Sequence, residues 1–182
     1  MWSLKTKQWA VVLHLALALA SITGCGMDDS GQSDSSVPAA GTKSLDDATN
    51  DTQRVSSDLL DLIKVKGKAS EPGPRVSECG DGKDREKYFQ MRHPWSLTPA
   101  SGDELAGVME RLKGELPEHG WKIVHYERDS SRNKNLRLTA DHDERKFSVS
   151  IVHLAKNEKP KLSVTVVSGC YQVPEGQRVD RY

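Results

Sequence analysis

The chain has 182 residues and no formal net charge, because 26 lysines and arginines balance 26 aspartates and glutamates. Residues 1–24 contribute two lysines and no acid, so the rest of the chain carries 24 basic and 26 acidic residues. Since an obligate nucleic-acid binder shows a basic surplus, we expect no nucleic-acid partner.

Residues 1–24 have the pattern of a secretory signal peptide. Lys5 and Lys7 precede an almost wholly apolar run from residue 9 to 20, and small residues close the segment. This run is shorter than the ~20 residues that a helix needs to cross the hydrocarbon core. A basic start, a short apolar middle and a small-residue end are typical of a segment that is removed on export.

The signal segment ends in Ile22-Thr23-Gly24-Cys25, which resembles the lipobox of bacterial lipoproteins. The resemblance implies that signal peptidase cleaves between Gly24 and Cys25 and that the Cys25 sulfur receives a diacylglycerol. A further acyl chain, such as palmitate, would follow on the new amino terminus. Two or three acyl chains, at ~0.8 kcal/mol per buried methylene, hold a protein lastingly at a membrane. The resemblance therefore implies a lipid anchor at the extracytoplasmic face of a bacterial membrane, most simply the cell membrane.

Residues 25–43 are expected to be a lipidated, disordered tether. Ser, Asp and Gly dominate this stretch and leave almost nothing to bury. A flexible segment of ~18 residues reaches roughly 20–25 Å, which holds a domain clear of the lipid headgroups. The alternative to an anchor is an ordinary secretory signal in which Cys25 occurs by chance.

Residues 44–66 predict an amphipathic helix. Ser44 and Asp47 form a capping pair at its start. Four apolar residues then share one helical face: Val55, Leu59, Leu62 and Ile63. This helix either packs on the domain or binds a partner. Residues 67–78, which contain two prolines, are predicted to be a linker.

Residues 79–173 predict one α+β domain, a two-layer sandwich in which one main helix packs on an antiparallel sheet of four or five strands. Ser101 and Glu104 form a capping box for that helix, and Pro117 and Gly120 end it. Alternation of apolar and polar residues predicts four strands: 121–126, 136–140, 147–151 and 162–166. The aromatic and apolar residues within 85–97 predict an earlier strand.

Cys79 and Cys170 are the two cysteines besides Cys25, and an exported pair most simply forms one disulfide. Cys170 keeps the even-numbered parity of the apolar residues in the last strand, so we expect it to point to the covered side of the sheet. Closing a loop of roughly 90 residues contributes ~4–5 kcal/mol in the chain-entropy model. The bridge would leave no thiol for catalysis or metal binding. Residues 174–182, which follow the domain, are expected to be a loose tail.

No catalytic residue and no cofactor is predicted. The run Asp141-His142-Asp143 offers metal ligands, but neighbouring residues seldom converge on one ion and this run suits a hairpin turn, so we expect no metal. His125 and His153 are in phase with apolar strand positions, which favours edge or core histidines. No Gly-x-Ser-x-Gly elbow activates a serine.

The chain is therefore expected to be a lipid-anchored binding or interaction module of the cell envelope and not an enzyme. It would contact an envelope protein, a peptide or a wall component. Its polar tether and single cysteine pair resemble those of small actinobacterial lipoproteins.

Two alternatives stay open. One is an inhibitor of an extracellular hydrolase such as lysozyme, since the Ser-Gly loop of such inhibitors is distantly similar to Ser168-Gly169-Cys170. The other is a small envelope hydrolase. A pocket with converging polar side chains favours a ligand binder or an enzyme, and a flat apolar patch on residues 55–63 favours a protein partner. A protruding loop around Cys170 favours the inhibitor.

Overall fold

The computed structural model describes residues 39–70, 72–80, 83–105 and 107–179. Their elements are, in chain order, β1 (Ala39–Thr42), α1 (Leu45–Ile63), β2 (Gly67–Ala69), β3 (Arg75–Ser77), β4 (Tyr88–Pro99), the 3₁₀ helix η1 (Gly102–Leu105), α2 (Val108–Glu118), β5 (Lys122–Arg128), β6 (Leu136–His142), β7 (Phe147–Leu154), β8 (Lys161–Ser168) and β9 (Cys170–Gln172). The expected signal peptide, the lipobox with Gly24 and Cys25, and most of the expected tether lie outside the described residues.

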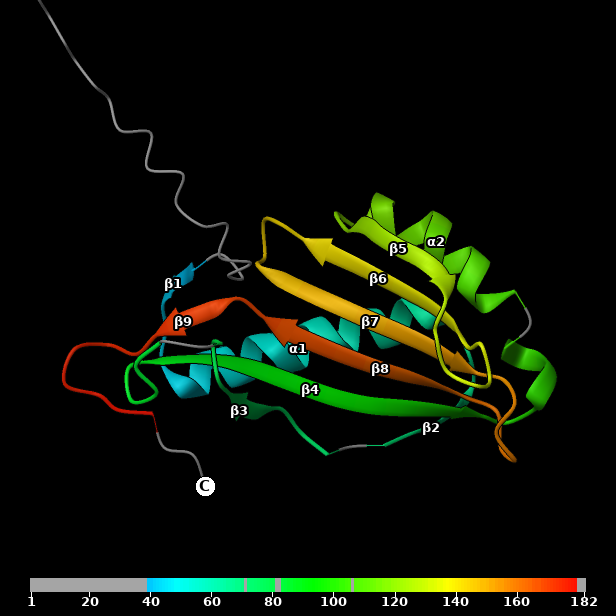
Figure 1. The fold of residues 1–182 in the computed structure, drawn as a ribbon, viewed down its shortest axis with the longest axis horizontal. Coiled ribbons are helices and arrows are strands. Elements are labelled where there is room, and N and C mark those ends of the chain that lie inside the picture. Colours follow the sequence, from blue (N-terminus) through cyan, green and yellow to red (C-terminus); the bar gives the residue numbers. More distant parts are fainter. Residues whose placement is uncertain (1–38, 71, 81–82, 106, 180–182) are drawn as a thin grey trace, which may run out of the picture. The chain divides into compact units, whose positions relative to one another are not determined.

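Within the described chain, nine strands form one sheet in the order β1-β9-β4-β8-β7-β6-β5, and β2 and β3 pair with the other edge of β4. Because β1 runs parallel to β9 and the other pairs are antiparallel, the sheet is mixed. It curls into a half-barrel (Figure 1).

The predicted two-layer sandwich with an antiparallel sheet of four or five strands is therefore wrong. The five long strands, β4 to β8, lie where the sequence predicts strands. The other four strands, β1, β2, β3 and β9, have only three or four residues each, too few to show a period of two. Backbone pairing with β4 and with one another adds them to the sheet, and this pairing leaves no mark in a single sequence.

Both α-helices pack on one face of the sheet, α1 against β4 and β8 and α2 against β5 and β6 (Figure 1). Apolar side chains from the two helices and the sheet form one buried cluster: Val55, Leu59, Ile63, Leu112, Leu116, Leu138, Ile151, Leu162, Val164 and Val166. The apolar stripe predicted within residues 44–66 therefore packs on the domain. The opposite face of the sheet carries mostly polar side chains.

The start of α2 differs from the expected capping box. Ser101 is followed by the 3₁₀ helix η1, and α2 begins only at Val108 behind Gly107, which adopts a φ of 73° and offers no side-chain cap. Glu104 Oε2 is buried and has no hydrogen-bond partner in the described chain, so the reciprocal cap is not formed there. Pro117 lies inside the last turn of α2 and does not end it.

Strand β5 contains a bulge that reverses the expected facing of His125. Its pairing with β6 shifts between Ile123 and His125, so that Ile123 and Tyr126 both pack against the core. Because one inserted residue moves every later side chain to the other face, His125 is exposed on the open face of the sheet. The prediction that His125 is in phase with the apolar positions is therefore wrong. His153 is half-buried on the core side, as predicted.

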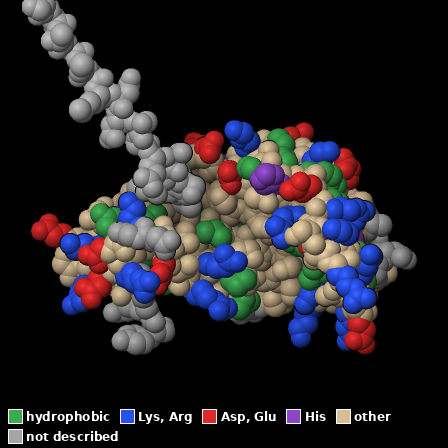
Figure 2. All heavy atoms as spheres, viewed as in Figure 1, with side chains coloured by type: hydrophobic (Ala, Val, Ile, Leu, Met, Phe, Trp, Pro, Cys, Tyr) green, Lys and Arg blue, Asp and Glu red, His purple; other side chains and the backbone are tan. Residues whose placement is uncertain are grey.

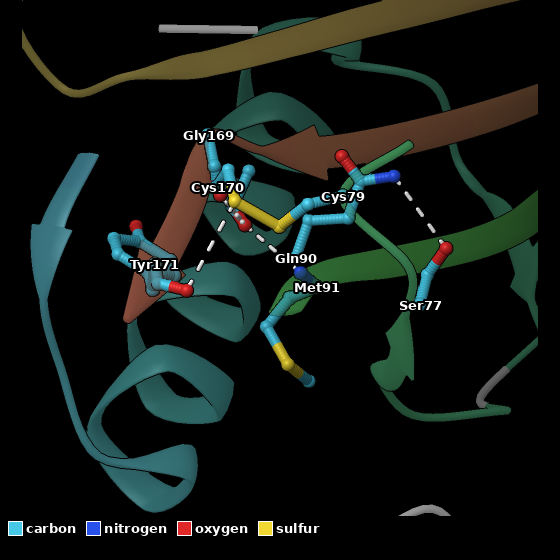
Figure 3. Close-up of a disulfide and its surroundings, with 8 residues drawn as sticks. Ser77, Cys79, Gln90, Met91, Gly169, Cys170 and Tyr171 are labelled. Carbon is cyan, nitrogen blue, oxygen red and sulfur yellow. Dashed lines mark hydrogen bonds between the residues drawn. A yellow bond between two sulfur atoms is a disulfide. The ribbon is translucent and has the colours of Figure 1, made fainter. Parts of the chain in front are cut away.

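The predicted disulfide is confirmed. Cys79, between β3 and β4, is bonded to Cys170 at the start of β9, and their Cα atoms are 5.5 Å apart (Figure 3). The backbone N–H of Gly169 donates to the Lys146 carbonyl (2.6 Å), and Ser168 Oγ accepts from the Met91 N–H (2.9 Å). The bridge therefore fixes the point where the chain passes from β8 into β9.

The ordered chain extends beyond the predicted domain at both ends. Residues 39–42 of the expected tether form β1, and the Lys43 ammonium lies 4.9 Å from the centre of the Tyr171 ring. In the expected loose tail, Val179 is buried and its N–H donates to the Glu86 carbonyl (2.9 Å). A second, smaller apolar cluster joins these segments: Ala48, Phe89, Met91, Tyr171, Val173 and Val179.

Candidate functional site

A cavity of about 550 Å³ lies between α1 and β4. The helix, the strand and the segment between β2 and β3 all contribute to its lining: Gln53, Ser56, Ser57, Leu60, Ala69, Ser70, Gly73, His93 and Trp95. None of these residues is an acid, a lysine or an arginine. The volume falls within the range of roughly 300–1,000 Å³ that small-molecule sites occupy.

Helix and strand periodicity bring these side chains together. Gln53, Ser57 and Leu60 are spaced by four and three residues, so they form a stripe along one side of α1. His93 and Trp95 are two residues apart on β4, so both point to the face that α1 covers. The cavity therefore has a helical wall and a floor on the sheet.

The third side of the cavity is an interruption in the strand pairing along one edge of β4. β2 pairs with residues 97–99 of β4 and β3 with residues 90–92, which leaves a gap between them. Ser70 partly fills it, because its N–H donates to the Ser96 carbonyl and its Oγ accepts from the Ser96 N–H, both at 2.9 Å. Pro94 points its nitrogen to the same edge as Ser96. Since proline has no N–H, the missing ladder leaves no donor unpaired at that position.

Ser56 and His93 form the one polar pair within the cavity lining that joins α1 to the sheet. Ser56 Oγ and His93 Nδ1 are 2.8 Å apart. Burial lowers the pKa of His93, so the imidazole is neutral and its Nδ1 can accept the serine proton. No carboxylate contributes to this shift, so the described residues supply a serine–histidine pair without the acid of a catalytic triad.

Trp95 gives the cavity floor an unusual polar atom. Its side chain is only 6% exposed, and its indole Nε1 is buried without a hydrogen-bond partner in the described chain. Leaving a buried donor unpaired costs roughly 1–3 kcal/mol, and such groups are rare in folded proteins. The floor therefore carries a local cost of stability at the place where the cavity lies.

A second cavity of about 620 Å³ continues from the first toward the C-terminal end of α1. The two share Leu60 and Ala69 in their linings, but the second also contains Asp61, Lys64 and Lys66. The two cavities together form one groove, which has an uncharged half beside β4 and a charged half beside β2.

The structure does not bring the weak metal candidates together. Asp141 Oδ1 accepts a hydrogen bond from Ser148 Oγ (2.6 Å), whereas His142 is buried edge-on against Trp121. Burial, followed by the charge of Arg145, lowers the pKa of His142. Asp143 is exposed in the turn that follows. Across the described residues, no three His, Cys, Asp or Glu side chains are placed to share a metal ion.

The region around Cys170 does not protrude. Ser168 is 1% exposed and Cys170 6% exposed, and both belong to the sheet. This geometry offers no loop of the kind that the inhibitor alternative requires. The apolar face of α1 is likewise buried, and Val124 is the only large apolar side chain that is exposed in the described chain.

The sequence reasoning missed the cavity residues, although two of them leave a signal. Ser56 interrupts the buried stripe of α1 between Val55 and Leu59, and His93 interrupts the apolar alternation of β4 between Met91 and Trp95. A polar residue in the buried pattern of an element needs a partner, so two such residues are candidates to meet. Only the fold shows that they do.

Comparison with known proteins adds no name to this geometry: no protein-family model, no curated protein and no solved structure matches the chain. Among the described helices, none has the length and hydropathy that crossing a bilayer requires. The fold and the cavity therefore define the molecule only as a disulfide-linked domain of mixed helix and sheet with a polar, uncharged cavity between α1 and β4.

Proposed function

We propose that the chain is a lipid-anchored, extracytoplasmic binding module of a bacterial cell envelope that takes a small uncharged ligand between α1 and β4. The observation that carries the binding part is the cavity of about 550 Å³ with polar but uncharged walls. A site of this size with a few converging polar groups is the usual form of a ligand pocket.

The lining specifies the chemistry of the ligand. Gln53, Ser57 and Ser70 offer amide and hydroxyl groups that both donate and accept hydrogen bonds, and Leu60 and Ala69 offer apolar contact. No side chain in this half of the groove would offset a charge on the ligand, and burying an unpaired charge is costly. A neutral ligand that carries hydroxyl and amide groups, as N-acetylated sugars do, matches this lining.

Calorimetric titration of the purified chain with N,N′-diacetylchitobiose tests the site. We expect saturable binding of this neutral disaccharide and none of its de-acetylated counterpart, which is cationic. Ser57→Trp, which fills the cavity from the exposed side of α1, should abolish the binding, whereas Ser130→Trp in the β5–β6 loop should not. Equal binding of both sugars, or equal loss in both variants, would contradict the assignment.

The anchor is a separate part of the proposal and rests on Ile22-Thr23-Gly24-Cys25. The Cys79–Cys170 disulfide supports export, because such bonds persist in oxidising compartments. In cells fed a palmitate analogue, the chain should incorporate the label and sediment with membranes. Cys25→Ala should lose the label, while Cys79→Ala should keep it. Crosslinking of intact cells then shows whether an envelope protein accompanies the anchored form.

A small envelope hydrolase is the second candidate, and the Ser56–His93 contact of 2.8 Å favours it. In an acyl transfer, Ser56 Oγ would attack the substrate carbonyl while its proton passes to His93 Nδ1. The bond to the leaving alcohol would then break, with that proton returned to the alcohol, and water would hydrolyse the acyl-serine to release the acid and restore Ser56. The test is hydrolysis of p-nitrophenyl acetate by the chain and by Ser56→Ala. Release of nitrophenolate that disappears in the variant supports the hydrolase, and equal rates exclude a role for this serine.

A further inference from the structure

The sheet face opposite the helices presents a second, chemically different surface. On β4, β6, β7 and β8 the side chains of this face alternate with the buried ones, and most of those in its middle are hydroxyls: Ser96, Thr98, Thr139, Ser148, Ser150, Ser163 and Thr165. Ladder pairing places them side by side, as in the row from Thr165 to Ser150 to Thr139. Figure 2 looks onto this face.

Two pairs of cations lie at the two ends of the hydroxyl region along β4. At one end Arg75 and Arg92 are directly opposite each other across the β3–β4 ladder. At the other end Lys68 is opposite Thr98, and Lys161 follows the Leu97–Leu162 pair on the other side of the same threonine. Six residues of β4 separate the two ends, which corresponds to about 20 Å at ~3.3 Å per residue.

The side chains of these four cations form no ion pair or hydrogen bond with another described residue, whereas the charged residues of the helix side are widely paired. Like charges directly opposite each other on one sheet face are destabilising. The Arg75–Arg92 pair therefore costs stability in the isolated chain. An anion between the two guanidinium groups would turn this repulsion into attraction.

The helix side of the domain differs in charge from the two cation pairs along β4. Helix α1, on the other side of the sheet, carries five aspartates and a single arginine: Asp46, Asp47, Asp51, Asp58, Asp61 and Arg54. The open face shows lysine and arginine side chains below the hydroxyl region and at its right-hand end, and acidic side chains along its upper edge (Figure 2). The part of this face along β4 therefore attracts polyanions, whereas the α1 side repels them.

We propose that this open face binds a linear anionic polysaccharide, with acidic groups at the two cation pairs and sugar hydroxyls on the serines and threonines between them. The serine and threonine hydroxyls between the cations suit a ligand that forms hydrogen bonds along its length. Binding to an anionic bilayer would need only the cations and not these hydroxyls. The described face also lacks a protruding apolar anchor for lipid, since Val124, at the edge strand β5, is the only large exposed apolar side chain. This surface is independent of the cavity between α1 and β4.

The test is binding of the purified full chain to immobilised polygalacturonate, with neutral dextran as the uncharged control. We expect binding to polygalacturonate alone and a steep loss as the salt concentration rises, because the contacts are between exposed charges. Arg75→Gln combined with Arg92→Gln should weaken binding about tenfold, the equivalent of two exposed ion pairs.

Arg54→Gln combined with Lys113→Gln is the matched control, because it removes two cations from the helix side and changes the net charge equally. It should leave the affinity unchanged. Equal weakening by both double variants would contradict a specific face, and binding to dextran would contradict recognition of the acid. Binding to phosphatidylglycerol vesicles without binding to polygalacturonate would assign the face to a membrane and overturn the proposal.

Discussion

Ser56 and His93 are each a polar exception in an apolar pattern, and the fold brings the two together at 2.8 Å. Either residue alone would leave a desolvated polar group without a partner. Burial determines the protonation state of this histidine, because it lowers the pKa of His93 and so favours the neutral imidazole. Burial has the same effect on the pKa of His153, and burial with the charge of Arg145 on that of His142.

The lowered pKa values of these three histidines determine how the free energy of unfolding should depend on pH. Each has a folded-state pKa below the ordinary value of 6.5, so the unfolded chain binds more protons than the folded chain as the pH falls below about 6.5. The free energy of unfolding should therefore be constant above pH 7.5 and decrease from pH 7 to pH 5. Urea unfolding at pH 7.5, 6.5 and 5.5 measures it.

His93→Gln should reduce the slope of that decrease, because glutamine can hold Ser56 but does not titrate. Asp51 does not interfere in this range. Burial opposes ionisation of Asp51, but hydrogen bonds from Lys43 and Arg54 outweigh it and hold the pKa below its ordinary 3.8. A chain that became more stable between pH 7 and pH 5 would refute this reading.

Replacing either of two glycines in or next to α2 with alanine should change the stability of the protein, in opposite directions. Gly120 has a φ of 82°, and a Cβ placed there would lie 2.9 Å from His142 Nε2, so Gly120→Ala should cost at least about 1 kcal/mol. Gly114 lies inside α2 with open space around it, so Gly114→Ala should stabilise by roughly 0.5–1 kcal/mol. Chemical denaturation compares the two, and a neutral or stabilising effect of Gly120→Ala would show that the turn at Gly120 is not constrained.

At the scale of the elements, the described fold depends on how short strands attach to β4. This strand has twelve residues and pairs with β2, β3, β8 and β9, and the disulfide joins the segment before it to the start of β9. The bridge closes a separation of 91 residues, so it restrains the unfolded chain strongly. It also holds β9, and with β9 the parallel strand β1, against the sheet.

Removing the bridge should therefore destabilise the domain and loosen one end of it first. Cys79→Ala combined with Cys170→Ala should lower the free energy of unfolding by about 2–4 kcal/mol. Hydrogen exchange should accelerate in β1 and β9 more than in β6 and β7, which pair with neither β4 nor β9. Uniform acceleration across the sheet, or no loss of stability, would show that the disulfide does not fix this end.

Periodicity predicts the long elements of this protein and misses the parts that pairing creates. The apolar stripe of α1 and the alternation in β4 to β8 follow from local burial, so the sequence shows both. The bulge after Ile123 reverses the facing of β5 without a change in composition, and β1 exists only because β9 lies beside it. The cavity was missed for a similar reason, since Ser56 and His93 are 37 residues apart.

On the scale of the whole described domain, the sheet separates two surfaces of different chemistry. The side with α1 is acidic on its exterior and contains the uncharged cavity, whereas the open side presents hydroxyls between two pairs of cations. A module held at a membrane by Cys25 would meet small neutral ligands and extended anionic polymers in the same envelope. The two surfaces can bind independently because none of the residues named for the open face lines the cavity.

An NMR titration of the isotope-labelled chain tests most directly whether the cavity between α1 and β4 is the ligand site. The indole N–H signals of Trp95 and Trp121 are followed while N,N′-diacetylchitobiose is added. Trp95 lines the cavity and Trp121 lies against His142 away from it. If the ligand binds in the cavity, the Trp95 signal and the Ser56 and Ser57 amide signals should shift saturably, and the Trp121 signal should not change. No shift at these positions, or a shift centred on Trp121, would contradict it.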